Sequence, residues 1–264
     1  MKKIGQNIIF FIFAFILLFL GIGRLNSTKL KVEESRIYVG SIPNSFVGTK
    51  LVHISDFHIE CDDKLSKLKK VVSEVADIEP DILIINGDFV MGNCGIDFDN
   101  DVAKELKPLD EIVWKFYTIG DEDKQSTKTI LNGAEFTLLN NKLFTLYNKE
   151  GDALDIVGVY PSSHNIELKN SATTLLFSHQ PDHLSNVDLS QVDIAFTAHT
   201  HVGKIYVPFY KGIISTEGAS SIGYQPFEKV GGLEIYTSRG VATSGFQIRY
   251  FNDPTIHFYR LDNK

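Results

Sequence analysis

Short apolar runs alternate with polar segments along most of the chain. Residues 51–54 are apolar in the way typical of a buried strand, and residues 64–78 carry apolar side chains at helical spacing until Pro80 ends the pattern. Residues 81–86 are a nearly continuous apolar run, as expected for a strand buried on both faces. This order of strand, helix and strand predicts a βαβ unit.

The residues that follow predict more strands than helices. A polar loop with Asp97, Asp99 and Asp101 comes first; it lacks the spacing of a calcium loop, so we expect solvated surface, followed by a short helix. Asn140-Asn141 and Gly151-Asp152 then predict turns between antiparallel strands. Further strands are predicted at residues 112–119, within 136–160, at 174–177, at 192–197 and within 204–261.

The N-terminal segment has a different pattern. Residues 8–23 contain no polar side chain, and residues 4–23 are long enough to cross a hydrocarbon layer of about 30 Å. The segment is either a cleaved signal peptide or a retained signal-anchor, and we favour a transmembrane anchor because the apolar run exceeds the usual signal-peptide core. We therefore assign residues 1–31 to an anchor with its juxtamembrane linker, and residues 32–264 to a globular domain.

Charges near the anchor bear on its orientation in the cell membrane. Lys2 and Lys3 precede the apolar run, whereas Arg24, Lys29 and Lys31 follow it, so the positive-inside rule does not decide the matter. A short basic N-terminus before a single span usually stays in the cytoplasm. This predicts a single-pass protein with an extracytoplasmic globular domain.

Composition and cysteine content narrow the function further. The net charge of −7 leaves no basic surplus to displace counterions, which argues against a nucleic-acid partner. Cys61 and Cys94 are compatible with either compartment: they form a disulfide outside the cell if their loops converge, or remain two partly buried thiols.

Histidines and carboxylates follow five of the predicted strands. In an extended segment the side chains at i and i+2 share a face, so Asp56 and His58 are expected to point the same way. A lone histidine after a strand is usually structural, but this set has too many donors for one tetrahedral zinc and suits two ions bridged by a carboxylate. The strand-end residues are Asp56 and His58, Gly87 and Asp88, residues 120–123, His179, and His199 with His201.

The order of these motifs resembles that of the calcineurin-like metallophosphoesterases. The family pattern is Asp-x-His, Gly-Asp, Gly-Asn-His-Asp/Glu, a lone His and Gly-His-x-His, and four of the five motifs match in order within roughly residues 45–262. FSHQPD, HVGKIYVP and SRGVATSGFQIR are similar to the membrane-associated bacterial branch with UDP-2,3-diacylglucosamine pyrophosphatase-like proteins. The resemblance implies an α/β fold, a four-layer sandwich of two mixed β-sheets flanked by helices, here preceded by the transmembrane helix.

The resemblance also implies a role for each motif residue. Two divalent metal ions, manganese, zinc or iron, would be bound. The first ion would be held by Asp56, His58 and His201. The second ion would be held by Asp121, His179 and His199, with Asp88 bridging the two.

Residues 120–123 depart from the family pattern. Asp121 stands where the family has an asparagine ligand, and Glu122 stands where it has a histidine that stabilises the transition state or protonates the leaving group. A carboxyl group can be a general acid if its pKa is raised, but as an anion it repels phosphate. We predict Glu122 and Asp123 as the catalytic side chains, with Glu122 or water assisting the leaving group.

These observations give three hypotheses from different classes. The first is a membrane-anchored phosphoesterase in which a metal-bridging hydroxide attacks a phosphodiester, pyrophosphate or phosphomonoester of a small or lipid-linked molecule. The second, motivated by residues 120–123, is a catalytically impaired metal-binding protein that binds or senses a phosphorylated envelope component. The third is an anchored adhesion domain whose histidines are incidental.

Overall fold

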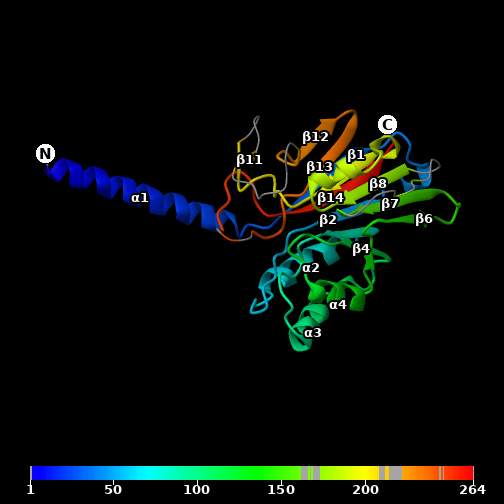
Figure 1. The fold of residues 1–264 in the computed structure, drawn as a ribbon, viewed down its shortest axis with the longest axis horizontal. Helices are drawn as coiled ribbons and strands as arrows, with labels where there is room; N and C mark the ends of the chain where they lie inside the picture. The colour runs from blue at the N-terminus through cyan, green and yellow to red at the C-terminus, as the bar shows by residue number, and fades with distance from the viewer. Residues whose placement is uncertain are drawn as a thin grey trace.

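Two six-stranded mixed sheets pack face to face in the computed structural model (Figure 1). The structure describes residues 2–161, 166, 168, 173–207, 212–213, 222–243, 245 and 247–263. This architecture confirms the predicted α/β fold with two mixed sheets.

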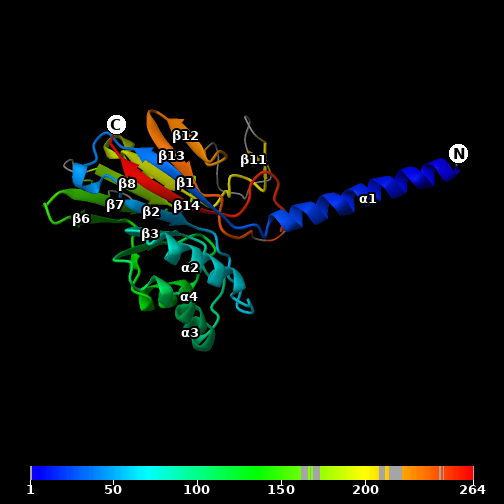
Figure 2. The same ribbon diagram turned by 180° about the vertical axis from the view of Figure 1, so that it is seen from behind.

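The first sheet carries the predicted βαβ unit. Its strand order is β1-β14-β2-β3-β4-β5; β14 runs antiparallel to β2, and the other neighbouring pairs are parallel. Helices α2 (Ser66–Ile78), α3 (Ile96–Glu105) and α4 (Gln125–Gly133) lie together on its outer side (Figures 1 and 2). The strands are β1 (Lys31–Tyr38), β2 (Lys50–Ile54), β3 (Ile82–Asn86), β4 (Trp114–Thr118), β5 (Thr137–Leu138) and β14 (Thr255–Asp262).

The second sheet has the order β12-β13-β9-β8-β7-β6. Its three central pairs are parallel, and the outer pairs β12–β13 and β6–β7 are antiparallel. In the described part of the chain, the 3-10 helices η3 (Pro181–Asn186) and η4 (Leu189–Gln191) follow β8 and contribute to the apolar cluster on its outer face. The strands are β6 (Lys142–Tyr147), β7 (Ala153–Val159), β8 (Thr173–Ser178), β9 (Ile194–Thr197), β12 (Phe227–Val230) and β13 (Leu233–Thr237).

In the described part of the chain, four further short elements lie outside the two sheets. The short strands β10 (Ile205–Tyr206) and β11 (Gly212–Ile213) pair with each other, and two further 3-10 helices are η1 (Asn44–Phe46) and η2 (Lys107–Leu109).

The alternation of side chains along β2 explains how this strand joins two cores. Val52 and Ile54 pack in the cluster under the helices, whereas Leu51 packs in the cluster between the two sheets. In that inter-sheet core the rings of Phe177 and Phe196 stack with centroids 4.7 Å apart. Both faces of the first sheet are thus buried, as the continuous apolar runs predict.

The prediction of an acidic loop around Asp97, Asp99 and Asp101 is wrong. Asp97, Asp99 and Asp101 all lie within α3, and the first two occupy its first turn. Carboxylates at that position face the unpaired N–H groups of a helix start, which stabilise negative charge. The acidic residues therefore begin the helix instead of preceding it.

Helix α1 (Lys2–Asn26) extends away from the sheets (Figures 1 and 2). Its segment Gln6–Asn26 is long and apolar enough to cross a membrane, and nearly all of that segment is exposed. Near its C-terminal end the Phe19 ring stacks on Tyr250 at 4.3 Å, and Gly23 O accepts a hydrogen bond from the Arg249 N–H at 3.0 Å. The division of the chain at residue 31 stays a prediction; β1 begins at that residue.

Candidate metal centre

The predicted ligands gather where five strands end. The strands β2, β3 and β4 of the first sheet and β8 and β9 of the second all deliver them. They form two groups, and within each group one donor atom of every residue lies within 4.8 Å of the others. The first group contains Asp56, His58 and His201. The second group contains Asp88, Asp121, His179 and His199.

The first group is buried and combines nitrogen with oxygen donors. His58 Nε2 and His201 Nε2 lie 3.3 Å apart. Asp56 Oδ1 lies 3.6 Å from His201 Nε2 and 4.0 Å from His58 Nε2. One cation among these three atoms would be contacted by two imidazoles and a carboxylate.

The second group is centred on His179. Its Nε2 lies 3.3 Å from both Asp88 Oδ2 and Asp121 Oδ1, and His199 Nδ1 lies 3.0 Å from the same Asp121 oxygen. His179 Nδ1 donates to the backbone O of Asn86 at 2.8 Å, so Nε2 is the ring nitrogen that faces the two carboxylates. Asp88 also clusters with His58 and Glu122, so it lies between the two groups.

The surroundings of two buried donor atoms indicate whether these residues fit a metal. Asp56 Oδ1 is buried and has no hydrogen-bond partner within the described chain, and the buried His179 Nε2 faces the carboxylate oxygens of Asp88 and Asp121. Buried polar atoms without a partner are rare and costly. Both atoms point into the groups described above, and the mixed nitrogen and oxygen set suits divalent transition metals. The residues therefore fit a metal in each group.

In the second group, the pKa values of His179 and Asp121 are shifted in opposite directions by their mutual contact. Although burial opposes it, the charges of Asp88 and Asp121 raise the pKa of His179 well above its usual value. Burial likewise opposes the pKa shift of Asp121, but His179 and His199 hold the pKa of its carboxyl below the usual range. Protons and metal ions therefore compete for the same donors.

The backbone at the ligands is left-handed. Asp56 and His58 have φ of 55° and 48°, so the extended geometry from which we predicted their common direction is wrong. They converge because a turn carries them: the Asp56 N–H donates to Gly87 O at 3.1 Å, and the His58 N–H donates to Asp88 O at 3.0 Å. Positive φ is uncommon outside glycine and marks strain held by surrounding structure. The predicted ligands with positive φ are Asp56, His58, Asp88, His199 and His201.

Gly87 and Gly120 are required because the side chains of predicted ligands lie too close to leave room for a Cβ atom. A Cβ at Gly87 would lie 2.3 Å from His179 Nδ1, and a Cβ at Gly120 would lie 2.1 Å from Asp88 Oδ1. Both distances are far below van der Waals contact. The residue before Asp88 and the residue before Asp121 must therefore lack a side chain.

Glu122 and Asp123 have different surroundings. Glu122 Oε2 lies 2.9 Å from His58 Nδ1, so the carboxylate accepts from the imidazole N–H. Asp123 is half-buried beside the predicted ligands, and its carboxylate accepts from the N–H groups of Gly120 and Asp88 at 2.8 and 2.9 Å and from the Thr127 hydroxyl at 2.7 Å. The predicted catalytic roles of both residues stay predictions.

Arg249 is a neighbour of the centre that the motifs did not identify. This fully buried side chain places Nη2 at 2.9 Å from His201 Nδ1. A guanidinium only donates, so the contact favours a proton on His201 Nε2. Binding of an ion through Nε2 requires the contact to open, and Arg249 has other acceptors in Arg239 O at 2.6 Å and Thr243 Oγ1 at 2.8 Å. The one sequence signal was its position in SRGVATSGFQIR.

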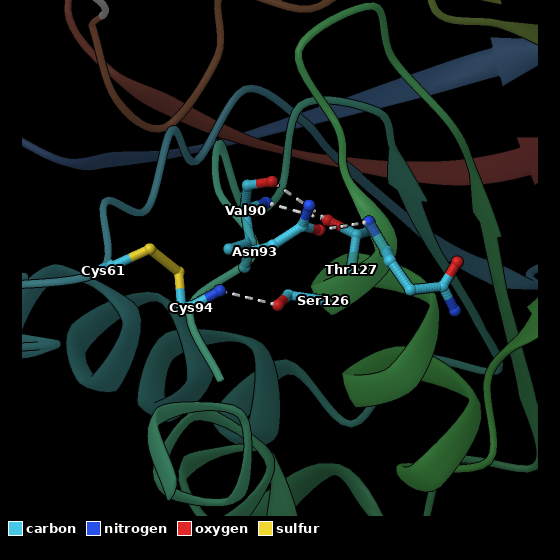
Figure 3. The surroundings of a disulfide bond; sticks show 7 residues. Cys61, Val90, Asn93, Cys94, Ser126 and Thr127 are labelled. Atoms are coloured by element: carbon cyan, nitrogen blue, oxygen red, sulfur yellow. Dashed lines mark hydrogen bonds between the residues drawn. A yellow bond between two sulfur atoms is a disulfide. The ribbon is translucent and has the colours of Figure 1, made fainter. Parts of the chain in front are cut away.

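A disulfide joins the loops that follow two of the predicted ligands. Cys61 lies shortly after His58 and Cys94 shortly after Asp88, and the structure pairs them with Cα atoms 5.0 Å apart (Figure 3). The Cys94 N–H donates to Ser126 Oγ at 3.0 Å, which links this loop to α4. Of the two alternatives open from the sequence, the structure contains the disulfide.

Two mixed sheets with histidines and carboxylates at their strand ends are the architecture of a metal-dependent phosphoesterase. Residues 49–203 match the family model described as calcineurin-like phosphoesterase. The chain belongs to this family of hydrolases.

Three relatives agree with this assignment. The chain is 24% identical over 251 residues to the metallophosphoesterase YkuE of Bacillus subtilis, covering 90% of this chain and 87% of that protein. It is 22% identical over 292 residues to LpxG of Chlamydia muridarum, a UDP-2,3-diacylglucosamine pyrophosphatase, covering 83% and 86%. It is 25% identical over 202 residues to a transmembrane protein with a metallophosphoesterase domain from Danio rerio, covering 67% of this chain and 45% of that protein.

Proposed function

We propose that the protein is a membrane-anchored phosphoesterase whose seven gathered donors hold two divalent ions. The observation that carries the proposal is the pair of adjacent donor groups with Asp88 between them. The buried oxygen Asp56 Oδ1 supports it, because a carboxylate oxygen without a hydrogen-bond partner is costly to bury unless a cation binds it.

When bound, divalent ions supply a hydroxide nucleophile and neutralise charge on the phosphoryl group. The chain itself supplies the orientation of the donors. Asn86 O fixes the tautomer of His179, and Glu122 accepts from His58 Nδ1 so that Nε2 faces the first group. Asp123 fixes the Asp88 and Gly120 backbone through its hydrogen bonds.

The substrate class that we propose is a lipid-linked phosphate or pyrophosphate. Two observations support it: α1 is apolar enough to lie in a bilayer, and one relative, LpxG, is a pyrophosphatase of a diacylated sugar nucleotide. A phosphodiester or phosphomonoester of the same location fits the donors equally well.

We further propose that the globular domain lies outside the cytoplasm. Disulfides persist in oxidising compartments and are rare in the cytosol. The Cys61–Cys94 pair therefore supports the orientation that the short basic N-terminus predicts.

The test is hydrolysis of an aryl phosphodiester by the full chain in neutral detergent, loaded with manganese. We expect Asp88→Asn to lower turnover at least about 100-fold, because loss of one preorganised electrostatic contact alone is worth about 10²–10³. Asp56→Asn serves as the control for contaminating enzymes. Full activity in Asp88→Asn would refute the mechanism, and no turnover with two metals bound per chain would favour the impaired metal-binding protein.

A further inference from the structure

A polar cavity lies between the C-terminal end of α1 and the start of α2, and none of the seven predicted ligands lines it. Its volume is about 440 Å³. Arg24 from the last turn of α1 lines one side, and Ser66, Lys67 and Lys70 from the first turns of α2 line the other. Leu30 and Val241 add apolar surface.

The lining of this cavity is cationic. Arg24, Lys67 and Lys70 face one carboxylate, Asp63, whose Oδ1 accepts from the Leu65 N–H at 3.0 Å. Within the described chain, none of the three cations makes an ion pair. Burial lowers the pKa of Lys67. Asp63 raises this pKa, whereas the positive charges of Arg249 and Arg24 lower it further. The cavity thus gathers three positive charges against one carboxylate.

The position of the cavity relates it to a membrane surface. Arg24 lies near the end of the apolar segment Gln6–Asn26, so a bilayer around α1 would bring its headgroup layer to this level. The stacking of Phe19 on Tyr250 and the hydrogen bond from Arg249 to Gly23 hold α1 against the domain. The cations therefore keep a fixed relation to the end of the span.

We propose that this cavity binds the phosphate of an anionic membrane phospholipid, a site separate from the metal centre. Charged hydrogen bonds from Arg24, Lys67 and Lys70, together with the unpaired N–H groups of the α2 first turn, would hold the phosphate. Leu30 and Val241 would contact the glycerol. Basic pockets beside membrane helices recognise headgroups in this way. The proposal rests on the proposed membrane placement of α1.

One wall of the cavity also contacts the turn that carries the predicted ligand Asp56. The Val241 N–H donates to Ser55 O and the Ala242 N–H donates to Asp56 O, each at 3.0 Å. A bound headgroup would therefore set the distance and tilt of the metal centre relative to the lipid surface, without contacting its ligands.

The test uses the full chain in neutral detergent, with lipid retention followed by native mass spectrometry. Dioleoyl phosphatidylglycerol is compared with dioleoyl phosphatidylcholine, for wild type, Lys67→Gln/Lys70→Gln and Arg24→Gln. The matched control is Lys69→Gln on the same helix, whose Nζ pairs with Glu105 at 3.2 Å on another face. We expect at least about tenfold weaker phosphatidylglycerol binding in the double variant, and about twofold or less change in the control.

Three results would overturn the lipid proposal. They are equal retention of phosphatidylcholine, equal loss in Lys69→Gln, and displacement of the lipid by a few millimolar inorganic phosphate (roughly the range of a free-anion site). Aryl phosphodiester hydrolysis, measured on the same samples, should not change in the double variant. In the wild type, hydrolysis without a preference for phosphatidylglycerol would refute this site alone, whereas a preference for phosphatidylglycerol without hydrolysis would refute the proposed function alone.

Discussion

Glu122 reaches the first donor group through His58, whose Nδ1 lies 2.9 Å from its carboxylate. Histidine ligands usually donate their second N–H to such a carboxylate, and loss of the partner weakens metal binding about 10–100-fold. We therefore expect Glu122→Ala to lower the affinity for one of two manganese ions by about that factor, measured by competition with a chelating dye.

Glu122→Gln keeps an acceptor for His58 and is the matched control, with a smaller expected loss. A residue that acts only as a general acid would behave differently. It would change the pH profile of turnover in both variants and leave the chelator titration as in wild type.

Asp123 accepts hydrogen bonds that the backbone cannot make elsewhere. Asp123→Ala leaves the N–H groups of Asp88 and Phe89 buried without a partner, at about 1–3 kcal/mol each. We expect the free energy of unfolding in urea to fall by about 3 kcal/mol. Asp62→Asn, on an exposed loop, should change it by less than about 0.5 kcal/mol. An equal loss in both variants would contradict this role.

At this scale, the gathered donors follow from the sequence because each one comes directly after an apolar run. The left-handed backbone at Asp56 and His58 does not, because it depends on hydrogen bonds to the turn at Gly87 and Asp88. Arg249 was not predictable either: it contacts His201 across 48 residues, and nothing local marks a buried guanidinium.

Among the elements, the loops after β2 and β3 depend on the disulfide. Cys61 and Cys94 close a loop with a sequence separation of 33. The entropy that this cross-link removes from the unfolded chain stabilises the fold by roughly 3–4 kcal/mol. We expect Cys61→Ser/Cys94→Ser to lose about that much unfolding free energy in urea.

The reduced wild type is the control for this substitution. It should lose as much stability as the double serine variant, because both lack the cross-link. A serine variant as stable as the oxidised protein would show that hydrogen bonds such as Cys94 N–H to Ser126 Oγ already hold these loops.

The strands themselves were predictable, but their partners were not. β14 lies between β1 and β2 although it is the last strand of the chain, and β5 joins the first sheet whereas β6 joins the second. Such pairings depend on contacts far apart in sequence, which a local pattern cannot encode. The error at α3 has a local cause: its carboxylates suit both a solvated loop and a helix start.

The stability of the whole molecule should depend on two histidines buried near the inter-sheet core. Burial lowers the pKa of His53 to about 3, and the pKa of His257 lies well below its usual value for the same reason. Both are neutral in the fold and gain protons on unfolding below about pH 6.5. The stabilisation is therefore complete above that pH and is lost as the pH falls toward 3.

For His53 alone, the unfolding free energy of the metal-free protein should fall by about 1.4 kcal/mol per pH unit below roughly pH 6.5. His53→Gln keeps an acceptor for Asn86 and cannot gain the proton, so urea unfolding at pH 7, 6 and 5 should vary less steeply. His183→Gln, at a half-buried position, should flatten the profile less. An unchanged slope in His53→Gln would exclude this source of acid sensitivity.

The stacking of Phe19 on Tyr250 joins the C-terminal part of α1 to the globular domain. With α1 in a bilayer, as we propose, a substrate in the same leaflet reaches the metal centre by lateral diffusion at one fixed height. Its effective concentration is then a surface density, set by its mole fraction among the lipids. An enzyme held in this way saturates according to the composition of its membrane, and the volume of the surrounding solution has no bearing on its rate.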